Sequence, residues 1–135
     1  KKRNNLLDGV PVNLPALIRS QRLQEKAGAV GFDWEDIESV IDKVEEEVGE
    51  LKLAIKNKSQ DSFKEEAGDL FFSLVNFCRH LGLDSESVVR EANRKFQARF
   101  NQIENILKVK GQSLESSSLS DLEFLWEKVK KSQLK

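Results

Sequence analysis

The chain of 135 residues has one cysteine, one histidine, two prolines, and neither methionine nor tyrosine. A lone cysteine, Cys78, cannot form an internal disulfide, and an unpaired thiol fits a reducing compartment, so we expect a cytoplasmic protein. One histidine and no cysteine pair make a zinc site a poor interpretation. No apolar run approaches the roughly 20 residues of a membrane-spanning helix. These scarcities exclude disulfide-stapled, zinc-dependent and transmembrane classes of protein.

Neither sign of charge dominates, because 22 Lys and Arg residues face 23 Asp and Glu residues, for a formal net charge of -1. No broad basic field is available for nucleic acid, and we expect no nucleic-acid or membrane partner. The length suits one domain with a real core, so residues 1–135 are predicted to form a single domain. The chain starts without methionine, and residues 1–13 are expected to be a flexible lead-in or the remnant of a longer chain.

Secondary structure is predicted to be helical throughout, because no segment alternates polar and apolar residues while apolar residues recur at helical spacing. The expected helices cover Pro15–Lys26, Trp34–Lys56, Ser62–Leu81, Asp84 or Ser85 to Lys110, and a last segment from about Ser120. Gly28 and Gly31 are predicted to end the first helix, and Asp33 to cap the second. Ser120 and Glu123 have the spacing of a capping box. The sum is an all-α bundle of four or five helices.

The third expected helix has an unusually wide apolar surface. Phe71, Val75 and Cys78 widen its main stripe, so we expect it to be buried on more than one side. A small monomer offers few partners for such a helix. We therefore expect a homodimer, with a monomer that covers this helix internally as the alternative.

Two acidic sequences echo each other, "EEVGEL" at 46–51 and "KEEAGDLFF" at 64–72. At about 100° per residue, each helix carries a carboxylate pair at positions i and i+3 on the edge of its apolar stripe. The pairs are Glu47 with Glu50 and Glu66 with Asp69. One such pair would most simply be solvated surface, but two matching pairs on antiparallel helices can face each other.

Four converging carboxylates would repel unless a cation lies between them. Oxygen ligands select hard ions, so Mg²⁺, Mn²⁺ or Ca²⁺ is expected and zinc is not. Gly49 and Gly68 weaken their helices, and a small residue there permits close approach of a helix or ligand.

Cations that could hold phosphate occur elsewhere in the sequence. Lys95 and Arg99 form an i, i+4 pair on one flank of the fourth helix, and Lys43 shares the flank of Glu47. Trp126 and Lys130 form a second i, i+4 pair that could contact a nucleotide, although Trp126 could equally be core. His80 is interpreted as an ordinary, partly buried histidine.

The chain resembles the MazG nucleoside triphosphate pyrophosphohydrolases, in particular their C-terminal catalytic domain. The specific part is the paired motif E-E-x-x-E with E-E-x-x-D, here at 46–50 and 65–69. The flanking stretches that match are "LPALIRSQRLQEKAGAVGFDW", "KVEEEVGEL", "EEAGDLFFSLVNFCRHLG", "EANRKFQARFNQIE" and "LWEKVK".

This resemblance implies a dimeric all-α fold and Mg²⁺-dependent hydrolysis of NTP or dNTP to the monophosphate and pyrophosphate. It assigns the metal to Glu47, Glu50, Glu66 and Asp69, and substrate contacts to Lys95, Arg99, Trp126 and Lys130. Glu46 is our choice for activating water, with Glu65 as its competitor. Two alternatives stay open: a specialised relative acting on dUTP, dCTP or a phosphoribosyl nucleotide, and a non-enzymatic helical interaction module.

Overall fold

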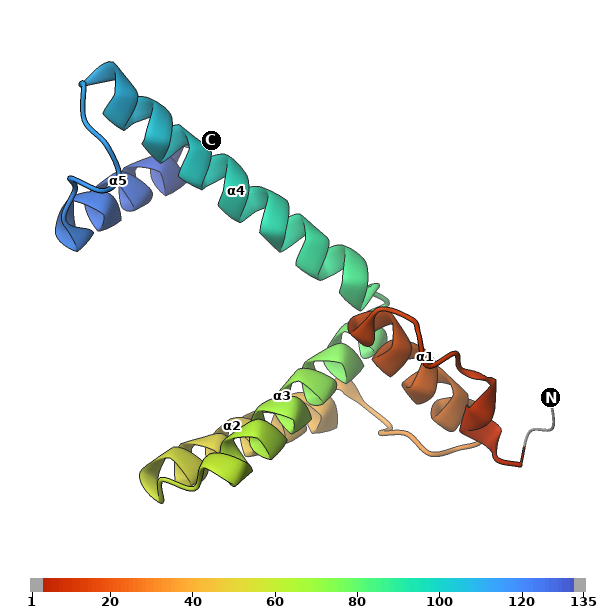
Figure 1. Cartoon of the computed structure of the whole chain (residues 1–135). Helices are drawn as coiled ribbons and strands as arrows, with labels where there is room; N and C mark the ends of the chain where they lie inside the picture. The colour runs from red at the N-terminus through yellow and green to blue at the C-terminus, as the bar shows by residue number, and fades with distance from the viewer. Residues whose placement is uncertain (1–3, 133–135) are drawn as a thin grey trace. The chain divides into compact units, whose positions relative to one another are not determined.

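The computed structural model describes residues 4–132, and every regular element in that range is helical (Figure 1). The elements are η1 (Leu6–Gly9), α1 (Ala16–Ala29), α2 (Ile37–Lys56), α3 (Gln60–His80), α4 (Ser85–Val109) and α5 (Leu119–Ser132). The prediction of an all-α chain with four or five helices is thereby confirmed, with five α-helices in these residues. Within the same range, no helix combines the length and hydropathy needed to cross a bilayer.

The chain divides into two compact units, one ending at Val88 and the other beginning at Val89. The first unit contains η1, α1, α2, α3 and the first turn of α4. The second contains the rest of α4 and α5. Each unit is described by itself below.

In the first unit α2 and α3 lie side by side as an antiparallel pair joined by residues 57–59 (Figure 1). Val40, Ala54 and Val75 are buried in this unit. α1 is fastened to α3 by Gln24, whose Nε2 donates to the carbonyl oxygen of Phe72 at 2.9 Å. The short connection thus brings the two acid-bearing helices together, as the sequence predicted.

The junction between α1 and α2 differs from the prediction. Gly28 lies inside α1 and does not end it, and Asp36, not Asp33, caps α2 by accepting from the Ser39 amide at 2.8 Å. A methyl group on Gly28 would lie 3.1 Å from Asp33 Oδ2 and 3.4 Å from Arg79 Nη1. Glycine at position 28 therefore leaves room for the Asp33 carboxylate. Asp33 is held by Arg79 and His80 of α3, so it does not cap α2.

At the starts of α4 and α5, one predicted cap is confirmed and the other is wrong. Asp84 accepts from the Ser87 amide at 3.0 Å, so it serves as the cap of α4 that was expected at Asp84 or Ser85. The capping box at Ser120 and Glu123 is wrong, because α5 begins one residue earlier at Leu119. Its first turn is capped by Ser118, whose Oγ accepts from the Asp121 amide at 3.1 Å.

The segment expected to be a flexible lead-in carries structure in its described part. η1 contacts α1, and Val10 directly after it is only 4% exposed. Residues 1–3 lie outside the described range. Residues 6–9 therefore form a regular element that contacts α1, and residues 11–15 contain no regular helix.

The second unit has its own small core between α4 and α5. Ile103 and Leu107 of α4 are buried together with Leu125 and Val129 of α5. These positions follow one another at helical spacing, so each helix contributes one apolar stripe. Trp126 packs against this core while remaining partly exposed.

Candidate metal centre

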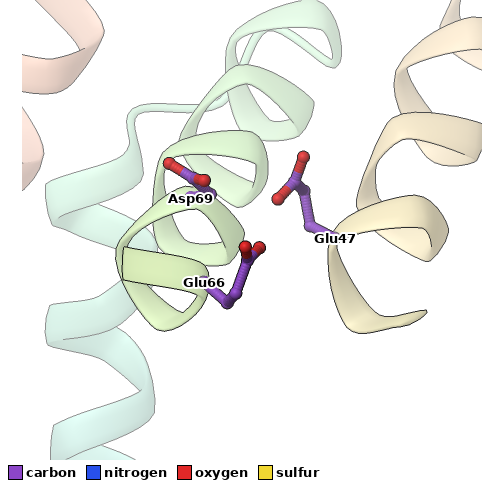
Figure 2. Close-up of side chains that lie close together, drawn as sticks. All are labelled: Glu47, Glu66 and Asp69. Carbon is purple, nitrogen blue, oxygen red and sulfur yellow. The ribbon is translucent and has the colours of Figure 1, made fainter. Parts of the chain in front are cut away.

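Three carboxylates from two helices converge in the first unit. Glu66 and Asp69 lie one turn apart on α3 and point toward Glu47 of α2 (Figure 2). One oxygen from each of the three lies within 4.8 Å of the others. That spacing allows a single cation to bind all three carboxylates.

Glu47 is nearly buried, at 7% exposure, and its charge is balanced by a lysine. Lys43 Nζ lies 3.1 Å from Glu47 Oε1 and 3.5 Å from Glu46 Oε2. The hydrogen bond that Lys43 donates to Glu47, together with the negative charge of nearby Glu46, raises the pKa of Lys43. Lys43 therefore supplies one positive charge at the edge of the acidic cluster.

The electrostatics of Glu66 show that one lysine does not balance the cluster. Desolvation raises the pKa of Glu66 first, and the negative charges of Asp69, Glu50, Glu47 and Glu65 raise it further. A carboxylate whose charged form is disfavoured by its neighbours gains from a cation placed among them. The site is thus short of positive charge in the bare chain.

The donors fit a hard divalent cation. All three converging side chains offer carboxylate oxygen, which suits Mg²⁺, Mn²⁺ or Ca²⁺ and gives no soft ligand for zinc or copper. Three protein oxygens would leave coordination positions open for water or phosphate, as Mg²⁺ usually requires.

The predicted residues are not all brought together. Glu50 is exposed and lies outside the tight group, although its charge reaches Glu66. Glu46 and Glu65, the candidates for water activation, are both exposed, and Glu46 is tied to the cluster through Lys43. The i, i+3 spacing therefore predicted the three carboxylates that converge, while Glu50 lies outside the group whose oxygens are within 4.8 Å of one another.

The expected substrate contacts lie on the second unit. Arg99 lies over the Trp126 ring, 5.7 Å from its centroid, and Phe96 packs against the same ring at 5.4 Å. Lys95 is exposed, and Lys130 Nζ lies 3.9 Å from a carboxylate oxygen of Glu127. These residues form a surface where a cation and aromatic rings lie together.

One polar network escaped the sequence reasoning. Asp33 Oδ1 is 2.6 Å from Arg79 Nη2 and 2.9 Å from His80 Nε2, and Asn76 accepts from the same guanidinium. His80 is partly buried, as expected, but has a defined partner. The partners are 46 and 47 residues apart, so no local spacing could have revealed the contact.

Comparison with known proteins agrees with this site. Residues 35–103, which include α2, α3 and the acidic cluster, match the MazG nucleotide pyrophosphohydrolase domain. The chain belongs to this family. It is 38% identical to the nucleoside triphosphate pyrophosphohydrolase of Escherichia coli strain K12 over 136 residues, covering 99% of the chain and 52% of that protein.

Two further proteins are similar in sequence to this chain. The nucleoside triphosphate pyrophosphohydrolase/pyrophosphatase MazG of Thermotoga maritima is 43% identical over 130 residues, which cover 96% of this chain and 50% of that protein. The phosphoribosyl-ATP pyrophosphatase of Methanoregula boonei is 40% identical over 63 residues, or 47% of this chain and 61% of that protein. The chain spans about half the length of the first two relatives.

Proposed function

We propose that this chain hydrolyses nucleoside triphosphates, both NTP and dNTP, to the monophosphate and pyrophosphate with Mg²⁺ as cofactor and Mn²⁺ as a substitute. The observation that carries the proposal is the convergence of Glu47, Glu66 and Asp69 in a domain of the MazG family. Two relatives of similar sequence are named for this activity.

Glu47, Glu66 and Asp69 would hold the cation, with Glu50 as a fourth ligand or as a source of negative charge nearby. When bound, the cation supplies a Lewis acid for the triphosphate oxygens. Water attacks the α-phosphorus, the bond to the oxygen that bridges the α and β phosphorus atoms breaks, and pyrophosphate leaves. Lys43, whose Nζ lies 3.1 Å from Glu47 Oε1, is proposed to contact phosphate.

The proton of the attacking water needs an acceptor. We assign this role to Glu46, because the contact with Lys43 keeps its carboxylate beside the cluster. Glu65 is the alternative acceptor, because it directly precedes the proposed metal ligand Glu66 on α3. It lacks the contact with Lys43 that Glu46 has. Lys95, Arg99, Trp126 and Lys130 are proposed to contact the substrate, and Arg99 on the indole ring of Trp126 offers a cation suited to phosphate.

We also propose that the chain acts as a homodimer. Phe71 is 65% exposed and Phe72 is 45% exposed in the single chain, although both lie in the middle of α3. A groove lined by Ile41, Val44, Glu45, Leu74 and Phe77 adds apolar surface along α2 and α3. Large apolar surfaces of this kind usually mark an interface.

Asp69→Asn tests the metal site, because it keeps size and helix but removes one ligand charge. Pyrophosphate release from dNTP with Mg²⁺ should fall roughly 100-fold or more, the scale on which a single electrostatic group contributes to a transition state. Helical circular dichroism should persist. Asp61→Asn, an exposed aspartate in the first turn of the same helix, is the matched control and should retain activity. Near-normal turnover by Asp69→Asn would contradict the assignment.

A second candidate is a specialised enzyme that acts on dUTP, dCTP or a phosphoribosyl nucleotide. The similarity to the phosphoribosyl-ATP pyrophosphatase of Methanoregula boonei favours considering it, although that match covers 47% of this chain. A panel of NTPs, dNTPs and phosphoribosyl-ATP separates the two candidates. Strong preference for one compound would select the specialised enzyme.

A further inference from the structure

Gln24 is a buried side chain whose hydrogen bonding is half complete. It is 7% exposed, and its Nε2 donates to the Phe72 carbonyl oxygen at 2.9 Å. Among the residues that the structure describes, two buried side-chain atoms lack a partner, Arg19 Nε and Gln24 Oε1. The orientation of the amide is fixed, because a carbonyl oxygen can only accept and must therefore face the NH₂ group. Gln24 Oε1 is thus a buried acceptor without a donor.

The neighbouring glutamine shows that this is not general to α1. Gln21 is equally buried, at 7% exposure, but its Oε1 accepts from both the amide and the hydroxyl of Ser85, at 2.9 and 2.8 Å. Gln21 is accounted for by the fold, since it holds the start of α4. Gln24 is only partly accounted for by its bond to α3. An acceptor kept away from water without a donor is costly, so it is expected to have a use.

The position of Gln24 connects it to the acidic cluster. The Phe72 carbonyl is three residues beyond Asp69, which is about 4.5 Å along the axis of α3. Ser73 and Asn76 continue the face of Asp69 at helical spacing, and both are buried, at 6% and 3% exposure. A polar strip therefore runs along α3 from the exposed Asp69 to the buried Ser73 and Asn76, and Gln24 of α1 is bonded to the Phe72 carbonyl that directly precedes Ser73.

We propose that Gln24 determines specificity by accepting a hydrogen bond from the nucleoside half of the substrate, an inference that rests on the proposed triphosphate site. With the α-phosphate at the carboxylates, the nucleoside extends along the polar strip toward the C-terminal end of α3. The group recognised is an N–H or O–H donor, either a sugar hydroxyl or an amino group of the base. The bond from Nε2 to the Phe72 carbonyl oxygen can persist, because Oε1 lies on the other side of the amide and accepts independently.

The first test uses the unaltered chain. We would measure kcat/KM for triphosphates that differ by one donor group: ATP against purine riboside triphosphate, CTP against 2-pyrimidinone riboside triphosphate, and each ribonucleotide against its 2′-deoxy and 3′-deoxy forms. Loss of the recognised donor should lower kcat/KM by roughly tenfold, the scale of one neutral hydrogen bond. A difference in kcat/KM between two triphosphates that differ in the base identifies an amino group as the donor. A difference between two that differ in the sugar identifies a hydroxyl. Equal values across every pair would overturn the proposal without recourse to any variant.

The second test compares Gln24→Met with Gln21→Met, two substitutions of similar size on one helix. Gln24→Met should reduce the preference of the unaltered chain to within about twofold of unity, whereas Gln21→Met should leave the ratio unchanged. Inhibition by Mg²⁺-tripolyphosphate, which has no nucleoside, should be the same in all three proteins. A substrate preference that persists in Gln24→Met would overturn the proposal. An equal loss of kcat/KM for every substrate in that variant would also overturn it.

Failure of the proposed function would look different. If no triphosphate is hydrolysed, calorimetric titration with α,β-methylene nucleotides compares the same donor pairs by binding alone. A tenfold difference in Kd that Gln24→Met removes would support the nucleoside contact even though the chain does not hydrolyse triphosphates. Equal Kd values for all pairs would remove the contact as well.

Discussion

Asp33 is a carboxylate committed to the fold and not to chemistry. The hydrogen bond from Arg79 is the largest of several effects that lower its pKa, and contacts with His80 and the Trp34 amide act in the same direction. The side chain is 26% exposed, so solvent screens the interaction only in part. These contacts join the segment before α2 to the end of α3 across 46 residues of sequence.

Asp33→Asn should destabilise the chain by about 2 kcal/mol at pH 7, since hydrogen bonds to charged groups are lost. A lowered folded-state pKa gives stability that is complete above the ordinary value of 3.8 and is lost as the pH falls below it. The difference between the two proteins should therefore shrink below about pH 4. Urea unfolding at several pH values measures it. Asp42→Asn, at an exposed position on α2, is the control, and an Asp33→Asn penalty that does not change with pH would refute the account.

At the scale of the element, α3 combines most of the features that matter. Its N-terminal half provides Glu66 and Asp69, its middle provides the buried Ser73 and Asn76, and its end provides the partners of Asp33. The sequence predicted the acids and the apolar stripe of this helix. It did not predict that Phe71 is 65% exposed, because the pattern of one helix does not say how many neighbours cover it.

Gly68 and Gly49 were expected to allow close approach, but among residues 4–132 of the single chain nothing lies within 4 Å of a methyl group at either position. Gly68→Ala should therefore stabilise the chain by about 1 kcal/mol, because alanine favours the helix. Gly28→Ala is the matched comparison and should not stabilise the chain, since its methyl group would lie 3.1 Å from Asp33 Oδ2. Thermal unfolding measures both. A lower Tm for Gly68→Ala would show that a neighbour, such as a second copy, occupies that space.

At the scale of the whole molecule, the exposed apolar side chains of α3 lead to a prediction about mass. In light scattering the chain should have twice its mass of 15.4 kDa. Phe71→Glu should lower the mass toward that of one chain, because it places a charge on the proposed interface. Val109→Glu alters a residue that is 89% exposed at the end of α4 and should leave the mass unchanged. A single-chain mass at all concentrations would exclude the dimer.

Local patterns in the chain are enough to predict the helical class, the position of each helix to within a few residues, and the acidic motif. Helical periodicity and i, i+3 spacing are local properties, so they can be inferred from neighbours along the chain. Glu47, Glu66 and Asp69 were all selected in this way before their oxygens were seen to lie within 4.8 Å of one another.

The packing of the helices sets which of these side chains are enclosed and what they contact. It separated Glu50 from the group, placed Lys43 against Glu47, joined Asp33 to Arg79, and left Gln24 Oε1 without a donor. Burial and long-range hydrogen bonds depend on how helices pack. Packing brings together residues far apart in sequence, and no local pattern encodes those contacts.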